Sequence, residues 1–276
     1  MTPQRGTVEE LTSRIRRKRA HSGQNVNALS LPLILRANPP AITRCPRLGL
    51  LSDVIPAAKT RAAASMEKQL ESTPFDVESC EGFSIYGDAG VFSGMHRDFL
   101  GGTWLRNIFG MKLWWFVPWT SMTDVEKEDF QDKGYRWNPG SKARALLIKP
   151  DQVLVMPSPL PHAVLTVENC LMEGGMFWDR ENITGTLENL QYTMKNWSTT
   201  NELPPFQLPD IIDELERMTK GHRSIRAIID HLRTLGCQCR GICSSRCKCR
   251  STRCTRWCTD HPTLPLNMAC MLEAGE

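Results

Sequence analysis

Three side chains in the middle of the sequence have the types and the spacing of a metal site. His96 and Asp98 are separated by one residue, and His162 follows 66 residues after His96. On a β-strand, residues i and i+2 point to the same side, so imidazole and carboxylate could meet at one ion. Two imidazoles and one carboxylate hold Fe(II) in non-haem oxygenases and leave positions open for a keto acid and dioxygen. A bare His-x-Asp arises by chance in about one chain in four of this length, so its surroundings must decide.

The segment from Glu81 to Asp179 consists of short apolar runs separated by glycine- and proline-rich turns. Strands are predicted at 82–86, 90–96, 103–109, 112–117, 144–148, 153–156, 162–167 and 171–178. Many short strands at close spacing favour a mainly β barrel or sandwich over a parallel α/β sheet. The stretch from Thr120 to Lys142 is too charged for a core, and we expect a surface insertion over one mouth of the barrel.

Helical patterns flank this segment. Residues 9–19 and 57–70 have the composition of helices, the second on the outside of the core, and residues 27–46 are expected to be extended. After Leu208, a first helix presents Ile211, Ile212, Leu215 and Met218 on one face. A second helix presents Ile225, Ile228, Ile229 and Leu232, and Gly236 is a stop signal. The run RIRRKR at 14–19 is either a nuclear-import patch or a solvated basic helix.

The neighbourhood of the histidines resembles a known family. The string HRDFLGGTWLRNIFGMKLWWFVPW, followed by KPDQVLVMPSPLPHAVLT and GGMFWD, is similar to JmjC domains of a kind associated with fungal proteins. The resemblance covers residues 80–180, about a third of the chain. It implies a double-stranded β-helix, a cupin- or jelly-roll-like barrel, with His96, Asp98 and His162 as Fe(II) ligands.

The resemblance also implies a co-substrate and a reaction. Lys112 matches the lysine that pairs with the distal carboxylate of 2-oxoglutarate, and Ser93 and Thr103 are candidates to hydrogen-bond it. A strand-edge lysine that reaches water is the alternative for Lys112, but a lysine buried among tryptophans would need an anion. The implied reaction is hydroxylation of a protein substrate, with a histone tail among the candidates, or demethylation if the substrate is N-methyl-lysine. An aromatic cage for methyl-ammonium in 114–119 is the weaker interpretation, because alternate rings on a strand face the core.

Seven of the 11 cysteines lie close together near the carboxyl end. Such short spacings suit Zn(II)–thiolate sites, and a segment this poor in apolar residues cannot form a core. The string CQCRGICSSRCKCRSTRCTRWC is similar to CXC (tesmin-like) zinc modules, which carry more cysteines in their fuller versions. The predicted Zn(II) ligands are Cys237, Cys239, Cys243, Cys247, Cys249, Cys254, Cys258 and His261.

The charge of the chain is divided unevenly. The net charge is +4, but residues 217–258 contain 11 Lys/Arg and one acid, so the remainder is acidic. A basic cysteine-rich tail could bind DNA through phosphates, or its basic residues could offset thiolate charge in a purely structural module.

These patterns divide the chain into five regions. They are an N-terminal wrap (1–79), the JmjC core (80–180), a helical segment (181–235), the zinc module (236–262) and a tail (263–276). No apolar run is long enough for a membrane helix and no secretory signal is present, so we expect a nuclear protein without a membrane partner. Two rival functions remain. One is a non-catalytic chromatin-binding protein with a degenerate JmjC scaffold, and the other is a zinc-dependent cupin-like protein.

Overall fold

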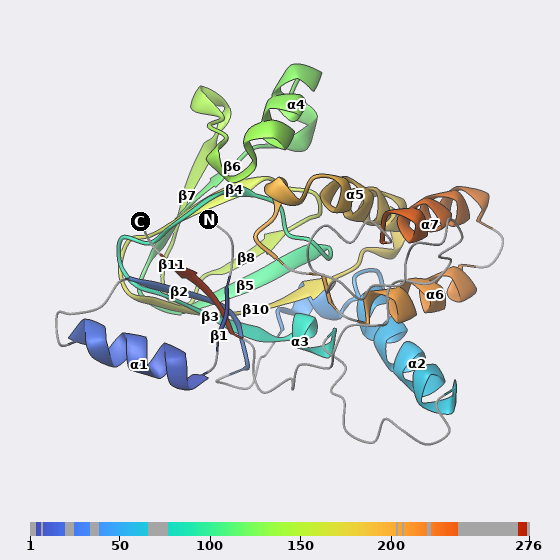
Figure 1. The fold of residues 1–276 in the computed structure, drawn as a ribbon, viewed down its shortest axis with the longest axis horizontal. Helices are drawn as coiled ribbons and strands as arrows, with labels where there is room; N and C mark the ends of the chain where they lie inside the picture. Colours follow the sequence, from blue (N-terminus) through green and yellow to red (C-terminus); the bar gives the residue numbers. More distant parts are fainter. Residues whose placement is uncertain are drawn as a thin grey trace, which may run out of the picture.

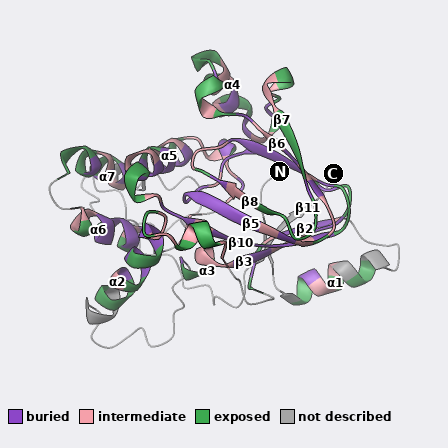
Figure 2. Cartoon of the chain, turned by 180° about the vertical axis from the view of Figure 1, so that it is seen from behind, coloured by how far each residue is buried: buried purple, intermediate pink, exposed green. Residues whose placement is uncertain are grey.

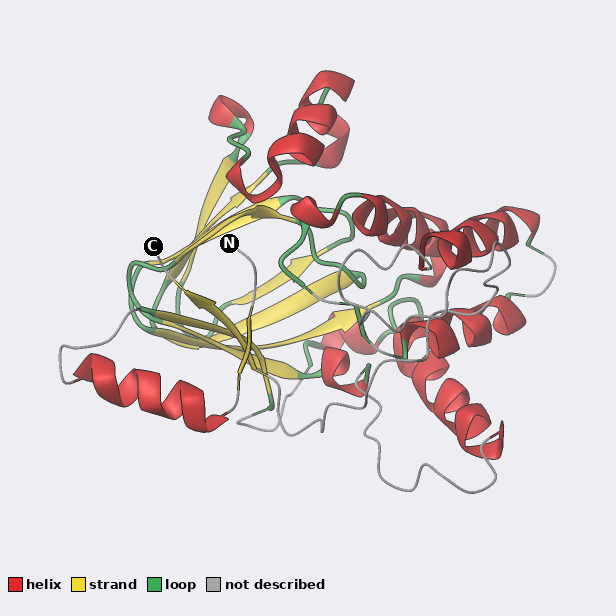
Figure 3. Cartoon of the chain, viewed as in Figure 1, coloured by secondary structure: helices red, strands yellow, loops and turns green. Residues whose placement is uncertain are grey.

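A computed structural model describes most of the chain. The described residues are 4–6, 8–19, 25–33, 39–65, 77–202, 204–205, 207–219, 222–236 and 270–274. The ribbon has two antiparallel sheets at its centre, with helices gathered beside one end of them (Figures 1 and 3). Among the described residues, no helix combines the length and the apolar character needed to cross a bilayer.

Eight consecutive strands form two facing sheets. They are β3 (Phe83–Gly87), β4 (Phe92–His96), β5 (Gly102–Phe109), β6 (Lys112–Phe116), β7 (Arg144–Ile148), β8 (Val153–Met156), β9 (His162–Thr166) and β10 (Cys170–Phe177). One sheet has the order β3-β10-β5-β8 and the other β4-β9-β6-β7. Counted from β3, these orders are 1-8-3-6 and 2-7-4-5, so strands distant in sequence become neighbours.

The two sheets enclose a common apolar layer. Inward side chains from both sheets meet there, among them Leu105, Trp114, Ile148, Val164 and Met172. Strand pairs within the described residues join strands of the same sheet only. The barrel expected from the sequence is therefore wrong in one respect: the architecture is an open sandwich.

The strand predictions within 81–179 are confirmed, with shifts of one or two residues at the ends. Period-2 alternation explains this accuracy. In β6, for example, Lys112 and Trp114 are buried between the sheets, while Leu113 and Trp115 face outward and are half-buried.

The first sheet is extended by strands from both ends of the chain. β2 (Val26–Leu31) pairs with β3, β11 (Cys270–Ala274) pairs with β2, and β1 (Gln4–Gly6) pairs with β11. The helix predicted at 9–19 is confirmed as α1 (Val8–Arg19), which contributes Leu11 to a small core with β2. In the described part of the expected extended run (residues 27–33 and 39–46), β2 is a strand and Ala41–Arg44 forms a 3-10 helix, η1.

A second core lies between helices at one end of the sheets. It is built by α2 (Leu50–Ser65), α5 (Ile183–Lys195), α6 (Leu208–Met218) and α7 (Arg223–Gly236), with Trp178 from the end of β10. The short helix α3 (Glu78–Glu81) precedes β3. The apolar faces predicted for α6 and α7 are confirmed except at Met218, which is exposed. Helix α7 is described as far as Gly236, the predicted stop, and the residues that follow lie outside the described part of the chain.

The start of α2 was predicted wrongly. The helix begins at Leu50 and continues through Pro56, whereas residues 57–70 were expected. Burial of Leu50, Leu51, Val54 and Ile55 in the helical core favours the earlier turns despite the hydrogen bond that Pro56 cannot donate. Residues 66–70 lie outside the described part.

The predicted insertion connects β6 to β7. It contains η2 (Trp119–Ser121), α4 (Asp124–Lys133), η3 (Gly134–Arg136) and η4 (Gly140–Lys142), and it projects from one end of the second sheet (Figure 1). It has an apolar core of its own, in which Met122, Phe130 and Trp137 are packed with Ala163 of β9. The charged residues that excluded it from the main core lie around this small cluster.

Candidate metal centre

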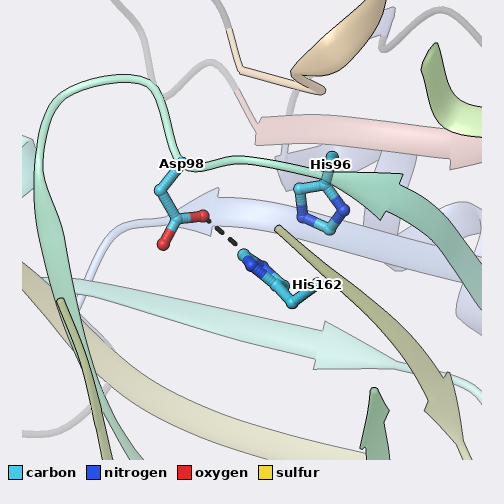
Figure 4. Close-up of side chains that lie close together, drawn as sticks. All are labelled: His96, Asp98 and His162. Carbon is cyan, nitrogen blue, oxygen red and sulfur yellow. Dashed lines mark ion pairs between the residues drawn. The ribbon is translucent and has the colours of Figure 1, made fainter. Parts of the chain in front are cut away.

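His96, Asp98 and His162 converge although they come from separate segments. His96 is the last residue of β4 and His162 is the first residue of β9, and the two are direct partners across these strands. One ligand atom from each of the three side chains lies within 4.8 Å of the other two. The side chains point toward one another in the close-up view (Figure 4). This is the geometry of a three-ligand metal site.

Both imidazole rings are oriented by the backbone. The Nδ1 atom of His96 lies 2.7 Å from the carbonyl oxygen of Gly94, and Nδ1 of His162 lies 2.9 Å from that of Leu160. When each Nδ1 carries the hydrogen and donates it to the carbonyl, Nε2 has a free lone pair for a metal. In metal-binding histidines, the hydrogen bond made by the other ring nitrogen fixes the tautomer and the orientation of the ring.

Asp98 reaches the site from a loop and not from the strand. Strand β4 ends at His96, so the expected i, i+2 alternation on one strand is not what aligns the carboxylate. Four hydrogen bonds hold the loop instead. Arg97 N–H donates to Thr199 O, Asn189 Nδ2 donates to the Asp98 carbonyl oxygen, and Phe99 N–H donates to Glu202 Oε2. Thr103 Oγ1 donates to Asp98 Oδ2 at 2.5 Å. The loop backbone is therefore held by residues far away in the sequence, and the carboxylate itself by Thr103, five residues further on.

Arg97, between two of the candidate ligands, points away from them into an aromatic clamp. Its guanidinium lies 4.3 Å from the ring centroids of both Trp119 and Tyr192, and only 2% of the residue is exposed. Burial lowers the pKa of Arg97 to about 10, so it stays charged at neutral pH. Arg97 thus connects the metal-site loop to the insertion and to α5.

Burial also sets the protonation of the candidate ligands. It lowers the pKa of His162 to about 4, which leaves a neutral imidazole, the form that binds metals. Burial raises the pKa of Asp98, while the neighbouring His96 and the Thr103 hydroxyl act in the opposite direction. Asp98 Oδ1 lies 3.6 Å from His162 Nε2. This distance is too long for a hydrogen bond with a neutral ring, and it leaves room for an ion between the two atoms.

The metal-site residues line a pocket between the two sheets, and so do the other predicted site residues. Lys112, Ser93 and Thr103 all contribute to its wall. Lys112 is 4% exposed and is flanked by Thr166 and Ile148 on the adjacent strands. Ser93 accepts a hydrogen bond from Asn27 Nδ2, and the Thr103 hydroxyl is engaged with Asp98. The fold therefore brings these three residues together with the candidate metal ligands in one pocket. Their roles in binding 2-oxoglutarate stay predictions.

The tryptophans of 114–119 face different surroundings. Trp114 points into the pocket, where its ring lies 5.4 Å from that of His162, and its buried Nε1–H has no acceptor among the described residues. Trp115 faces outward against Phe92, and Trp119 packs on Arg97. The three rings do not gather into one cage.

Several pocket residues were not found by the sequence analysis, among them Asn27 and Glu202. Asn27 enters from β2, and Glu202 enters from the segment after η6 (Trp197–Thr199). Glu202 Oε2 accepts from Phe99 N–H, next to Asp98, and burial together with the Asp98 charge raises the pKa of Glu202 well above its usual range. Neither residue lies in a motif. For Asn27, the only local signal was the spacing of apolar and polar residues in VNALSL (residues 26–31), which would have placed Asn27 on one face of a strand.

The predicted zinc ligands lie outside the described residues, so their arrangement is a prediction from sequence. These are Cys237, Cys239, Cys243, Cys247, Cys249, Cys254, Cys258 and His261.

A relative of this chain is known from a fungus. The chain is 36% identical over 196 residues to KK-1 biosynthesis cluster protein D of Curvularia clavata, which corresponds to 69% of this chain and 19% of the relative. The chain thus matches about a fifth of that protein's length. No protein-family model matches the sequence.

Solved structures show only weak likeness. Oxalate decarboxylase of Bacillus subtilis is 14% identical, with a TM-score of 0.25 over 36% of this chain and 20% of that one. The CENP-C cumin domain of Drosophila melanogaster is 5% identical, with a TM-score of 0.27 over 35% of this chain and 58% of that one. At these scores the description of the fold rests on the strand order alone.

Proposed function

We propose that this chain is an Fe(II)- and 2-oxoglutarate-dependent dioxygenase of the JmjC type. The observation that carries the proposal is the convergence of His96, Asp98 and His162 in one pocket with the buried Lys112. When bound, Fe(II) and 2-oxoglutarate supply the oxidation of a substrate C–H bond by dioxygen, with release of succinate and carbon dioxide. The chain supplies the ligands, the orientation of the keto acid and a pocket that excludes bulk water.

The residues present fit an iron ion. Two neutral imidazoles and one carboxylate are the ligand set of non-haem Fe(II) oxygenases. The carbonyls of Gly94 and Leu160 hold the rings and Thr103 holds the carboxylate. The two carbonyls raise the basicity of the rings, and all three partners fix the ligands in place before the metal arrives.

The residues present also fit a dicarboxylate. The Lys112 ammonium is buried in the wall of the same pocket, where an anionic partner would offset its desolvation. The buried indole N–H of Trp114 is a second donor in that wall. In the proposed complex, Lys112 binds the distal carboxylate, and Ser93 and Thr103 lie within the same wall.

The strand order supports a double-stranded β-helix. The orders 1-8-3-6 and 2-7-4-5 describe an eight-stranded jelly roll built from two sheets. In this architecture His96 and His162 lie at the ends of the second and seventh strands, and Asp98 lies in the loop after the second strand.

The substrate of the proposed enzyme belongs to one of two classes. The JmjC resemblance favours a protein substrate, with a histone tail as one candidate. The name of the fungal relative refers to a biosynthesis cluster, which favours a biosynthetic intermediate instead. Mass-shift analysis after incubation with histone peptides, and separately with extract of metabolites, distinguishes the two by a gain of one oxygen or loss of one methyl group.

The proposal extends to the tail on sequence grounds. The cysteine-rich segment would hold Zn(II), and its arginines and lysines would contact DNA phosphates and deliver the enzyme to chromatin in the nucleus. A purely structural zinc module is the competing interpretation.

Succinate release tests the proposed activity. Purified, Fe(II)-loaded protein is incubated with 2-oxoglutarate and dioxygen, and succinate is measured beside a His162→Ala sample. A non-catalytic scaffold would release none from either protein. A zinc-dependent cupin-like protein would be active without 2-oxoglutarate and would not need Lys112.

A further inference from the structure

The pocket between the two sheets carries its lysine far from the candidate metal ligands. Lys112 is the first residue of β6 and pairs with Thr166. His162 is the first residue of β9 and pairs with Phe116. These two register positions are four residues apart, which is about 13 Å along a strand. Lys112 is also the only lysine or arginine among the described residues of the pocket wall.

Glu202 lines the same pocket from the other side of the metal ligands. It follows η6 and accepts a hydrogen bond from the N–H of Phe99, in the loop after β4. Strand β4 runs toward His96 and ends there, and Phe99 beyond it packs in the core between the helices. The candidate metal ligands therefore lie between Lys112 and Glu202 along the pocket.

The carboxylate of Glu202 has one oxygen without a protein partner. Oε2 accepts from Phe99, but in the part of the chain that the structure describes no cation pairs with Glu202, and Oε1 accepts no hydrogen bond. Oε1 is nevertheless not among the polar atoms that the chain covers completely. A ligand in the pocket can therefore reach it.

The surroundings of this carboxylate favour a positively charged ligand. The pocket lies in the interior, and β5, which forms part of its wall, is buried along most of its length (Figure 2). A carboxylate in such a place is costly unless a cation meets it. The charge of Asp98, which has the same sign, and burial both raise the pKa of Glu202, and a cation acts against both effects.

The proposed metal ion does not take this role directly. The ligand atoms that lie within 4.8 Å of one another belong to His96, Asp98 and His162, and Glu202 is outside that group. A structural role would need only the acceptor for the Phe99 N–H, which leaves the second oxygen and the charge unexplained.

We propose that Glu202 binds a positively charged nitrogen of the substrate, in an ammonium or a guanidinium group. The assignment rests on the proposed function, in which 2-oxoglutarate occupies the Lys112 end of the pocket and leaves the Glu202 end to the substrate. Each charged ligand group then meets a side chain of opposite charge, on either side of the metal ligands. Neutral and acidic molecules are excluded as substrates, whether the substrate is a protein or a biosynthetic intermediate.

A titration of the full-length protein with n-butylammonium chloride tests the proposal. The protein is loaded with diamagnetic Zn(II), and binding is followed by saturation-transfer NMR at pH 8, where the amine is protonated. The parallel probe is 1-butanol, which has the same carbon chain and no charge. We expect the wild type to bind n-butylammonium with a Kd of about 1 mM, in the range of so small a ligand, and 1-butanol more weakly.

Glu202→Gln should weaken binding of n-butylammonium at least tenfold and leave binding of 1-butanol unchanged. Glutamine has the same length and still offers an oxygen to the Phe99 N–H, so a purely structural role would not alter the titration. The matched control is Glu188→Gln, which removes an exposed carboxylate on α5 and should bind both probes like the wild type. Circular dichroism verifies that each variant is folded.

Three results would overturn the proposal. The first is a wild-type protein that binds n-butylammonium no more tightly than 1-butanol, and the second is equal binding by the wild type and Glu202→Gln. The third is a folded Glu202→Gln protein with less bound metal than the wild type, which would assign Glu202 to the metal site. Succinate release is measured separately, so a cation site without succinate release would contradict the proposed activity and leave the cation site in place.

Discussion

His96 and His162 are direct partners across β4 and β9, and their ring centroids lie 4.2 Å apart. Two histidines 66 residues apart in the chain thus share one register position, each with Nδ1 against a backbone carbonyl. Their Nε2 atoms are available to one ion together with Asp98. This relationship leads to the first prediction.

Replacing any one of His96, Asp98 and His162 by alanine should weaken Fe(II) binding by at least two decades. Loss of a supporting outer residue alone costs 10–100-fold, and loss of a ligand costs more. The measurement is the visible absorption of the Fe(II)–2-oxoglutarate complex, which cysteine-bound metal does not produce. The control is His222→Ala at an exposed position. An unchanged titration for one variant would remove that residue from the ligand set.

Thr103→Val should weaken Fe(II) binding by about 10–100-fold without unfolding the protein. The valine keeps the shape of the side chain but removes the hydroxyl that donates to Asp98 Oδ2. The same absorption titration measures the effect. Thr60→Val is the control, because its hydroxyl donates to a backbone carbonyl within α2. If Thr103→Val binds Fe(II) normally but needs more 2-oxoglutarate, Thr103 instead contacts the co-substrate, as the sequence suggested.

Lys112→Met should raise the Michaelis constant for 2-oxoglutarate strongly and leave Fe(II) bound. Methionine retains the length of the side chain and loses the charge. Removing one member of a buried ion pair costs roughly 3–5 kcal/mol, or about two to four decades in affinity. Lys149→Met, at an exposed position, serves as the control. A Michaelis constant equal to that of the wild type would show that Lys112 does not bind the co-substrate.

Gly94→Ala should destabilise the protein by roughly 1–3 kcal/mol, the usual cost of overpacking. The new methyl group would collide with backbone of the insertion at Tyr135. Urea unfolding monitored by tryptophan fluorescence measures the change. Gly49→Ala is the matched control, since its methyl group would meet only ordinary van der Waals contacts. Equal stability of Gly94→Ala and wild type would mean that the insertion shifts freely on the sheet.

The cysteine-rich segment should bind Zn(II), and the module folded around the zinc should bind DNA. Replacing Cys247 and Cys249 by serine is expected to lower the zinc content of the full-length protein, measured by atomic absorption. Binding of duplex DNA should weaken as salt rises, with a slope that reflects the number of phosphates neutralised. Zinc bound normally but no DNA bound at low salt would leave a structural role only.

The sequence by itself determined the strands and the candidate ligands. Alternation and turn residues are local signals, so β3 to β10 could be placed within one or two residues. His96, Asp98, His162 and Lys112 could be named from their types and spacing together with a family resemblance. The apolar faces of α6 and α7 followed from periodicity in the same way, except at Met218.

Only the tertiary structure decided how the site is assembled and what surrounds it. Asp98 stands in a loop held by Asn189 and by the carbonyl oxygen of Thr199, and Glu202 joins the pocket from a segment without a motif. The early start of α2 depends on burial against distant helices, which outweighs the local effect of Pro56. The apolar outer face of the sheet β4-β9-β6-β7 appears only when its four strands are set in register. Each of these features arises from contacts between residues far apart in the chain, and local sequence patterns carry no information about such contacts.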